Sequence, residues 1–222
     1  MAKSAADTTP TPRAYRSPLR ERQVAQTRES ILSAVAEEIL EHGIHTLSMS
    51  GVAARAEVAE RTVYRHFAST ETLLDGLTEM VGARLGELLG DRPRLRHDRE
   101  DPLDDLVEHL PGLYAAFDRI GAPARAVAVV TLARGSDAGR QRRREVLSAA
   151  FAPELAHLPQ EEASALFETL YLLGGSVSWH LLTRSGELTG EQAGRAATRV
   201  VRAVLRDLRK DARLSGRAQS RT

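Results

Sequence analysis

A short segment at residues 59–67 places polar, basic and aromatic side chains on one face of a predicted helix. Val63 and Phe67 are four residues apart and would both face a core. The side chains on the broad opposite face are Glu60, Arg61, Tyr64 and Arg65. Arginine and tyrosine donate hydrogen bonds to phosphate oxygens, and arginine can also bind the edge of guanine. This pattern on so short a helix is typical of an element that reads a groove of DNA.

Two further helices are expected to position that face. Apolar residues recur at helical spacing over residues 18–42, namely Val24, Ile31, Val35 and Ile39. Pro18 suits the first turn of this long helix, and Gly43 supplies its stop. Ser48 can cap a second, short helix over residues 48–56. The three segments together predict a helix-turn-helix.

A fourth helix is expected from Thr70 to Gly90, with Ser69 as its cap. Gly82, Gly86 and Gly90 follow one another at four-residue spacing and so lie along one side of this helix. Each glycine weakens a helix by about 1 kcal/mol relative to alanine. The spacing therefore indicates close packing of this side, in preference to an adjustable connection.

The rest of the chain also predicts helices, and no alternating pattern of a strand competes with them. A surface loop is expected at residues 91–100. The next helix is expected to start at Asp101-Pro102 and to bend or break at Pro111. The remaining expected helices run from Pro123 to Arg134, from Arg140 to Phe151 with Pro153 closing it, from Pro159 to Arg184, and from Thr189 to Arg209. The fold class is therefore all-α. The expected segments are a mobile arm at 1–17, a three-helix helix-turn-helix domain at 18–69, a helical ligand-binding and dimerisation domain at 70–212, and a tail at 213–222.

Composition excludes several classes of function. The 222 residues include no cysteine, so disulfides, thiolate metal sites and cysteine nucleophiles are excluded. Gly174-Gly175-Ser176 lacks the last glycine of a nucleophile elbow, no phosphate loop occurs, and His42 and His45 lack a metal-binding pattern. We therefore expect no enzyme, no cofactor and no metal.

The N-terminal residues lack the apolar core of a signal peptide, and no apolar run approaches the roughly 18 residues of a membrane span. A cytoplasmic protein without a membrane partner is the expectation. The net charge is only +1, which favours locally placed basic residues over a basic coat.

The many helices after Gly90 exceed what contact with DNA requires, and they predict a site for an unidentified small-molecule effector. Ligand sites are mostly apolar with a few polar groups. The candidate pocket residues are Tyr114, Phe117, Phe167, Tyr171, Trp179 and His180. Each of them can equally be ordinary core.

The two last predicted helices carry apolar sides broader than a small domain needs to cover, and such stripes mark interfaces. Small residues on both helices permit close approach of a second copy. A homodimer built from these helices is expected, with Phe167, Gly174, Val200 and Val204 in the interface.

The stretch from Thr27 to Leu74 resembles the DNA-binding region of the TetR family. Its most specific part is Thr62-Val63-Tyr64-Arg65-His66-Phe67, which is followed by a serine-containing turn and an acidic, leucine-bearing helix start. Upstream, the spacing of the family is kept by Gly43, Thr46, Ser48 and Val52-Ala53.

The resemblance implies a supporting helix at 48–56 and a recognition helix at 59–67. It implies phosphate contacts at Ser48, Tyr64 and His66. It implies contacts to base edges at Ser50, Glu60, Arg61 and Thr62. Arg65 joins this set through its place on the exposed helix face, and Thr70 through its place where the family often has a lysine that contacts phosphate.

Two more positions depart from the pattern of the family. Glu57 stands where a glycine is common in the turn, and Ala59 where a capping serine is common. Without the glycine we expect a less comfortable turn, and without the cap a recognition helix weakened by about 1 kcal/mol.

The resemblance implies a ligand-responsive regulator of transcription. The leading interpretation is a repressor that binds a palindromic double-stranded operator as a dimer. The alternative is a helical ligand-binding or adaptor protein with weakened DNA binding. Glu57, Glu60 and the near balance of charge over the first 70 residues favour that alternative.

Overall fold

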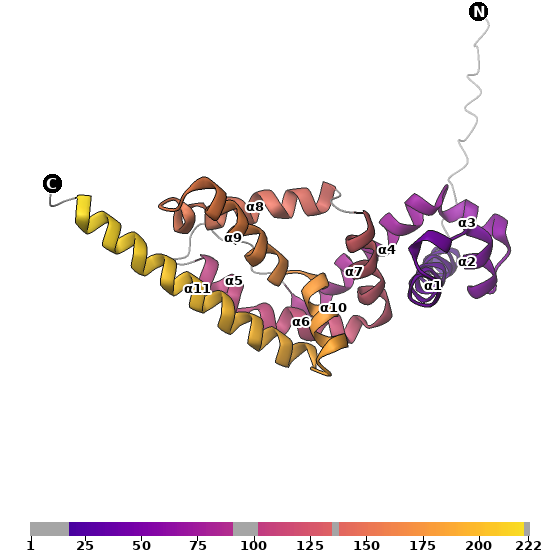
Figure 1. Ribbon diagram of the computed structural model, residues 1–222. Helices are drawn as coiled ribbons and strands as arrows, with labels where there is room; N and C mark the ends of the chain where they lie inside the picture. Colours follow the sequence, from indigo (N-terminus) through magenta and orange to yellow (C-terminus); the bar gives the residue numbers. More distant parts are fainter. Residues whose placement is uncertain (1–17, 91–101, 135–137, 220–222) are drawn as a thin grey trace, which may run out of the picture.

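The structure is a computed structural model that describes residues 18–90, 102–134 and 138–219 (Figure 1). Within these ranges all regular secondary structure is helical and there is no strand, as the sequence predicts. The expected mobile arm and the expected loop at 91–100 lie outside the described residues. Three N-terminal helices form a unit at one end of the molecule, and the long last helix runs away from it along the remaining helices (Figure 1).

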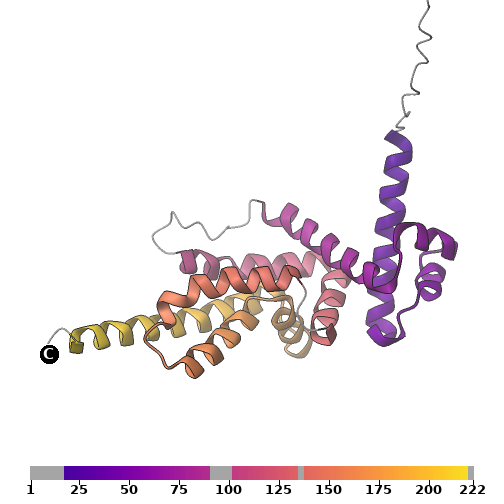
Figure 2. The same cartoon turned by 90° about the horizontal axis from the view of Figure 1, so that it is seen from above.

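Helix α1 spans Pro18–His42, as predicted. Gly43 ends it in the left-handed region with a φ of 87°, and its N–H donates to the carbonyl of Ile39 at 2.9 Å. A single 3-10 turn, η1 at Ile44–Thr46, then leads into the next helix. Figure 2 shows α1 standing steeply across the direction of the other long helices.

Helices α2 (Met49–Arg55) and α3 (Glu60–His66) pack on one another, and α2 also packs on α1. Their shared core is made of buried apolar side chains, namely Ile31, Val35, Val52, Val63 and Phe67. Because both helices are shorter than three turns, this burial rather than helix propensity stabilises them. The predicted three-helix arrangement is confirmed.

Helix α4 (Thr70–Leu89) connects the N-terminal unit to the rest of the chain. Ser69 and Thr72 form a reciprocal capping box at its start. At Gly82 and Gly86, however, no atom lies within 4 Å of the place where a Cβ would be. Within the described residues, the expected close packing is therefore not seen at the Cβ positions of these two glycines. Gly90 acts instead as a helix stop, with a φ of 64°.

The middle helices are α5 (Pro102–Glu108), α6 (Leu110–Ile120), α7 (Ala122–Arg134) and α8 (Ala138–Leu155). Pro111 lies in the first turn of α6, so the predicted break falls just before it. Pro153 was expected to close α8, but the helix continues to Leu155. Since only two residues follow Pro153 in this last turn, the helix tolerates the proline there.

The expected single helix from 159 to 184 is in fact two helices, α9 (Gln160–Leu173) and α10 (Ser176–Ser185). The break falls at Gly174-Gly175, where two adjacent glycines make helix least favourable. Side chains satisfy carbonyls at this break. Ser178 donates to Leu172 O at 2.9 Å, Tyr114 donates to Leu173 O at 2.7 Å, and Arg143 donates to Gly174 O.

Helix α11 (Gly190–Gln219) begins with the predicted capping pair, because Gln192 N–H donates to Thr189 Oγ1 at 3.2 Å and Thr189 N–H donates to Gln192 Oε1 at 2.9 Å. It continues past Arg209, where the sequence pattern placed its end. Its first turns lie against α6 with almost no space between the backbones. A Cβ at Gly194 would be 2.5 Å from Pro111 Cα.

Candidate nucleic-acid interface

The face of α3 predicted to meet DNA is open to solvent. Val63 and Phe67 are buried, whereas Glu60, Arg61, Tyr64 and Arg65 are all exposed, with 52% of Tyr64 accessible. The arrangement presents two guanidinium groups and a phenol on one surface.

The C-terminal end of α3 is held in place through Phe67. The guanidinium of Arg28 on α1 lies 4.7 Å from the centre of the Phe67 ring. Helix α4 also approaches Phe67 so closely that a Cβ at Gly76 would be 2.7 Å from Phe67 Cε1. Arg28 also pairs with Glu79 of α4 at 3.4 Å. The recognition face is therefore fixed relative to both neighbouring helices.

The supporting helix α2 starts at Ser48, whose Oγ accepts a hydrogen bond from Gly51 N at 3.1 Å. Ser50 Oγ lies 3.4 Å from Ser48 Oγ, and both serines are exposed. Their hydroxyls thus sit at the N-terminal end of α2, where backbone N–H groups also favour a phosphate.

An ion-pair cluster that the sequence reading missed joins α2 to α1. Arg55 pairs with Glu38 at 2.7 Å, with Glu41 at 2.5 Å and with Glu37 at 3.8 Å. The hydrogen bond from Arg55 and its charge lower the pKa of the Glu41 carboxyl. The acidic residues recur on one face of α1, but their partner is distant in the sequence, so only the fold reveals the pairing. Since Arg55 is occupied here, it is not part of the DNA-facing set.

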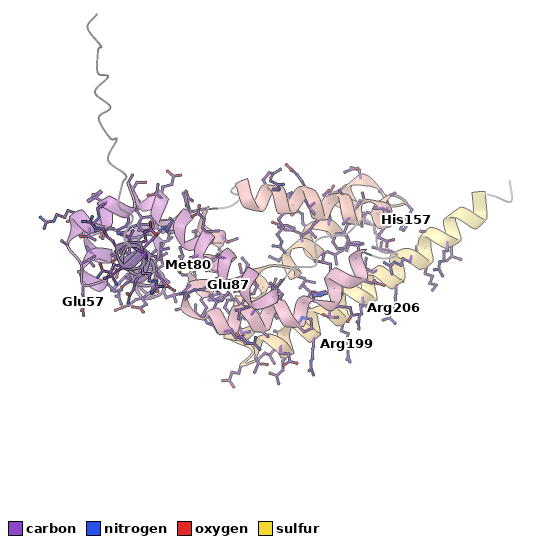
Figure 3. The ribbon with its side chains drawn as sticks, turned by 180° about the vertical axis from the view of Figure 1, so that it is seen from behind. Glu57, Met80, Glu87, His157, Arg199 and Arg206 are labelled. Carbon is purple, nitrogen blue, oxygen red and sulfur yellow. The ribbon has the colours of Figure 1, made fainter. Side chains whose placement is uncertain are left out.

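Both expected departures in the turn before α3 are visible. Glu57 has a φ of 54°, in the left-handed region that favours glycine, and it lies at the outer edge of the N-terminal unit (Figure 3). Ala59 is the N-cap of α3 and makes no side-chain hydrogen bond to the helix. The turn keeps the geometry of a helix-turn-helix without the residues that best stabilise it.

Three predicted contact residues are less accessible than the others. Thr62 and Thr70 are half-buried, Thr70 in the first turn of α4. His66 is half-buried as well, with Nε2 buried and without a hydrogen-bond partner. Burial, together with the charges of Arg65 and Arg28, lowers the pKa of His66. A neutral His66 can reach a phosphate only with its other nitrogen.

Residues 31–77 match the model of a family described as bacterial regulatory proteins, tetR family. This N-terminal stretch is similar to the DNA-binding region of that family. The matched residues run from the buried half of α1 through α2 and α3 to the first half of α4, which is the unit that presents the exposed face of the recognition helix.

Solved structures share the fold of a larger part of the chain. One is a TetR-like transcriptional regulator from Rhodococcus sp. RHA1, with 18% identity, a TM-score of 0.59, and coverage of 78% of this chain and 92% of that chain. A complex of SmeT with triclosan has 22% identity, a TM-score of 0.57, and coverage of 80% and 90%. A gamma-butyrolactone receptor described as an ArpA-like protein has 19% identity, a TM-score of 0.50, and coverage of 83% and 99%. No curated protein matches the chain.

In the C-terminal part of the chain, two of the pocket candidates are core residues. Tyr114 is fully buried and donates to Leu173 O at 2.7 Å, and burial raises its pKa to about 12. Trp179 is fully buried, and its Nε1 donates to Asp118 Oδ1 at 2.8 Å. Phe117 packs on Trp179, with ring centres 5.2 Å apart.

The other candidates fall into two places. Phe167 and Tyr171 stack on α9 with ring centres 5.9 Å apart, under the guanidinium of Arg144 from α8. His180 is buried beside Trp179, and its Nδ1 has no hydrogen-bond partner. Burial and the charges of Arg125 and Arg184 lower the pKa of His180. The six residues therefore lie in two places, and His180 has a buried polar atom, Nδ1, without a hydrogen-bond partner.

The four predicted interface residues also differ in exposure. Val200 is 50% exposed on α11, and Val204 is half-buried beside it. Phe167 is buried within the chain, and Gly174 lies next to the guanidinium of Arg143. Arg199 and Arg206 extend from another side of α11 (Figure 3).

Among the described residues, no helix is both long and apolar enough to span a bilayer, and no group of side chains has the composition of a metal site.

Proposed function

We propose that this chain is a repressor that binds a palindromic duplex operator as a homodimer in the cytoplasm and releases it when a small effector binds. The observation that carries the proposal is the exposed face of α3, with Arg61, Tyr64 and Arg65 on a helix whose end is fixed by Phe67. Ser48 and Ser50 supply hydroxyls beside it. The chain acts in this proposal by binding and not by catalysis.

We assign DNA binding to residues 18–69 and ligand binding and dimerisation to residues 70–212. Support for a dimer comes from exposed apolar side chains on α9, α10, the turn after it, and α11, namely Leu172, Leu181, Leu182, Leu188, Val200 and Leu214. On α11, exposed alanines at 196 and 203 flank Val200 and permit close approach of a second helix. An exposed apolar set of this kind normally marks an interface.

An apolar effector with one polar group suits the interior of the C-terminal part. The aromatic side chains there bring apolar surface, and the indole of Trp179 and the hydroxyl of Tyr114 are already used within the fold. Among the aromatic candidates, His180 has a buried ring nitrogen, Nδ1, without a hydrogen-bond partner, and this atom could hydrogen-bond a ligand. The similar structures include a complex with triclosan and a gamma-butyrolactone receptor, so the fold accepts small organic molecules.

The effector would act on DNA binding through α4, which joins the two parts. Gly82 and Gly86 weaken this helix, and among the described residues no atom lies within 4 Å of the place where a Cβ of Gly86 would be. Replacing both with alanine should stiffen α4 and reduce effector-driven release of DNA. Unchanged release would refute this role for the glycines and leave the fold assignment intact.

Binding to mixed-sequence duplex DNA at a series of salt concentrations tests the function. Docking of basic side chains on phosphates releases counterions, so affinity should fall steeply as salt increases. Tyr64→Ala should weaken binding to all sequences alike, with Leu132→Ala, an exposed position on α7, as a control that leaves binding unchanged. Absence of duplex binding by the wild type at low salt would favour the adaptor alternative.

A further inference from the structure

A groove beside the recognition helix is not explained by the predicted contacts. It has a volume of about 770 Å³ and lies between the N-terminal half of α1 and a second wall made by the turn before α3 and the last turn of α3. Its lining from α1 includes Arg20, Gln23, Gln26 and Thr27, and its lining from the other side includes Val58 and Arg65. Arg65 belongs to the exposed face of α3 as well, so the groove continues that face without interruption.

The lining residues from α1 follow the spacing of one helix face. Gln23, Thr27 and Ser30 are three, seven and ten residues after Arg20, which places them in a row along α1. This row lies in turns of α1 whose residues 18–26 are all exposed, so they contribute nothing to the core of the N-terminal unit. Arg22 lies on α1 outside the groove lining, although it is equally exposed.

The chemistry of the groove suits an anion with many oxygens. None of the described residues that line it carries a carboxylate, whereas Arg20 and Arg65 carry guanidinium groups at its two walls. The amides of Gln23 and Gln26 and the hydroxyl of Ser30 add neutral donors. The hydroxyl of Thr27 already donates to Gln23 O at 2.8 Å. Arginine, glutamine, serine and threonine are the side chains that commonly bind the oxygens of a sugar-phosphate strand.

We propose that this groove holds one sugar-phosphate strand of duplex DNA next to the bases that α3 reads, with Arg20 and Gln23 as phosphate contacts. The inference rests on the proposed function and enlarges the DNA-contacting surface. Because Arg65 belongs both to the groove and to the exposed face of α3, a duplex bound to α3 would also contact the groove. Contacts of this kind fix the position of a protein on DNA and carry no sequence information. They should therefore raise affinity for every sequence by a similar factor.

The test compares Arg20→Ala with Arg22→Ala. Both arginines are exposed on the same helix, so each substitution removes one positive charge. For each protein, affinity for mixed-sequence duplex is measured over a range of salt concentrations. Arg20→Ala should lower affinity at low salt and reduce the slope of log affinity against log salt by about 1 for each lost phosphate contact. Gln23→Ala should lower affinity with an unchanged slope, and Arg22→Ala should keep the wild-type slope.

Ethylation interference on a bound duplex gives a second measurement. The wild type should be sensitive to ethylation at a phosphate outside the bases contacted by α3, and Arg20→Ala should lose that sensitivity. Equal slopes for Arg20→Ala and Arg22→Ala, with the same interference pattern as the wild type, would overturn the groove assignment while DNA binding itself stands. Failure of the wild type to bind any duplex would overturn the proposed function and this inference with it.

Discussion

Asp118 on α6 accepts a hydrogen bond from the buried indole of Trp179 on α10, at 2.8 Å from Nε1 to Oδ1. Its second oxygen accepts from the backbone N–H of Gly190, the first residue of α11. One carboxylate thus joins three helices, and the guanidinium of Arg125 covers the other side of the indole at 4.8 Å from the ring centre. The C-terminal part is held together by this junction.

Replacing Asp118 tests the junction. Asp118→Ala leaves the Trp179 and Gly190 N–H groups without their acceptor, and an unsatisfied buried donor costs about 1–3 kcal/mol. The free energy of unfolding from urea titration should fall by about this amount. Asp207→Ala, at an exposed position of α11, serves as the control and should change it by less than about 0.5 kcal/mol. Equal stability of the two variants would show that the junction contributes nothing.

The turn before the recognition helix offers a stabilising substitution. Glu57 has a φ of 54°, a conformation that costs a residue with a Cβ about 1 kcal/mol or more and that glycine adopts freely. Glu57→Gly should therefore raise the free energy of unfolding by roughly 0.5–1 kcal/mol. Ala54→Gly, three residues earlier on an exposed position of α2, should lower it by about 1 kcal/mol. The melting temperatures of both variants test this prediction. A lower melting temperature for Glu57→Gly than for the wild type would contradict the claim that Glu57 is strained.

Glycines of two helices should respond to alanine in opposite directions. A Cβ at Gly194 would lie 2.5 Å from Pro111 Cα and 2.8 Å from Leu110 O, which are backbone atoms that cannot turn aside. Gly194→Ala should therefore destabilise the protein by about 1–3 kcal/mol, as overpacking does. At Gly86 the space is open, and Gly86→Ala should stabilise α4 by up to about 1 kcal/mol. Melting temperatures that shift the same way for both variants would refute this contrast.

The proposed dimer places Val200 in its interface. Val200 is 50% exposed in the single chain, so Val200→Asp should leave the fold intact and introduce a charge at the contact between copies. Sedimentation should change from dimer to monomer, and affinity for a two-half operator should fall. Leu132→Asp, which also charges an exposed apolar position but on α7, should remain dimeric. A dimeric Val200→Asp variant would exclude this face as the interface.

The N-terminal unit could be predicted from the sequence because its determinants are local. Ser48 and Ser69 cap the helices that follow them, Gly43 stops α1, and the spacing of Val63 and Phe67 separates the buried face of α3 from the exposed face. Each of these features depends on residues a few positions apart. The exposure of Tyr64 on a short helix could therefore be predicted from the sequence alone.

The C-terminal part could be predicted only as a set of helices, because its specific contacts join distant residues. The glycine spacing on α4 suggested close packing, yet the tight contact is at Gly194, whose partner Pro111 is 83 residues earlier in the chain. The bond between Asp118 and Trp179 joins residues 61 positions apart. Helical periodicity contains no information about which neighbour a residue will meet. The break at Gly174-Gly175 was missed because the apolar spacing continues across it.

Selection of bound sequences from a pool of random duplex DNA tests the central claim most directly. If the exposed face of α3 reads DNA in a symmetric dimer, the wild type should enrich an inverted repeat whose half-site centres are roughly 34–36 Å apart, about one turn of the duplex. Arg61→Ala should enrich the same spacing but lose its preference at one base in each half. A wild-type pool that remains random after repeated selection at low salt would contradict the account.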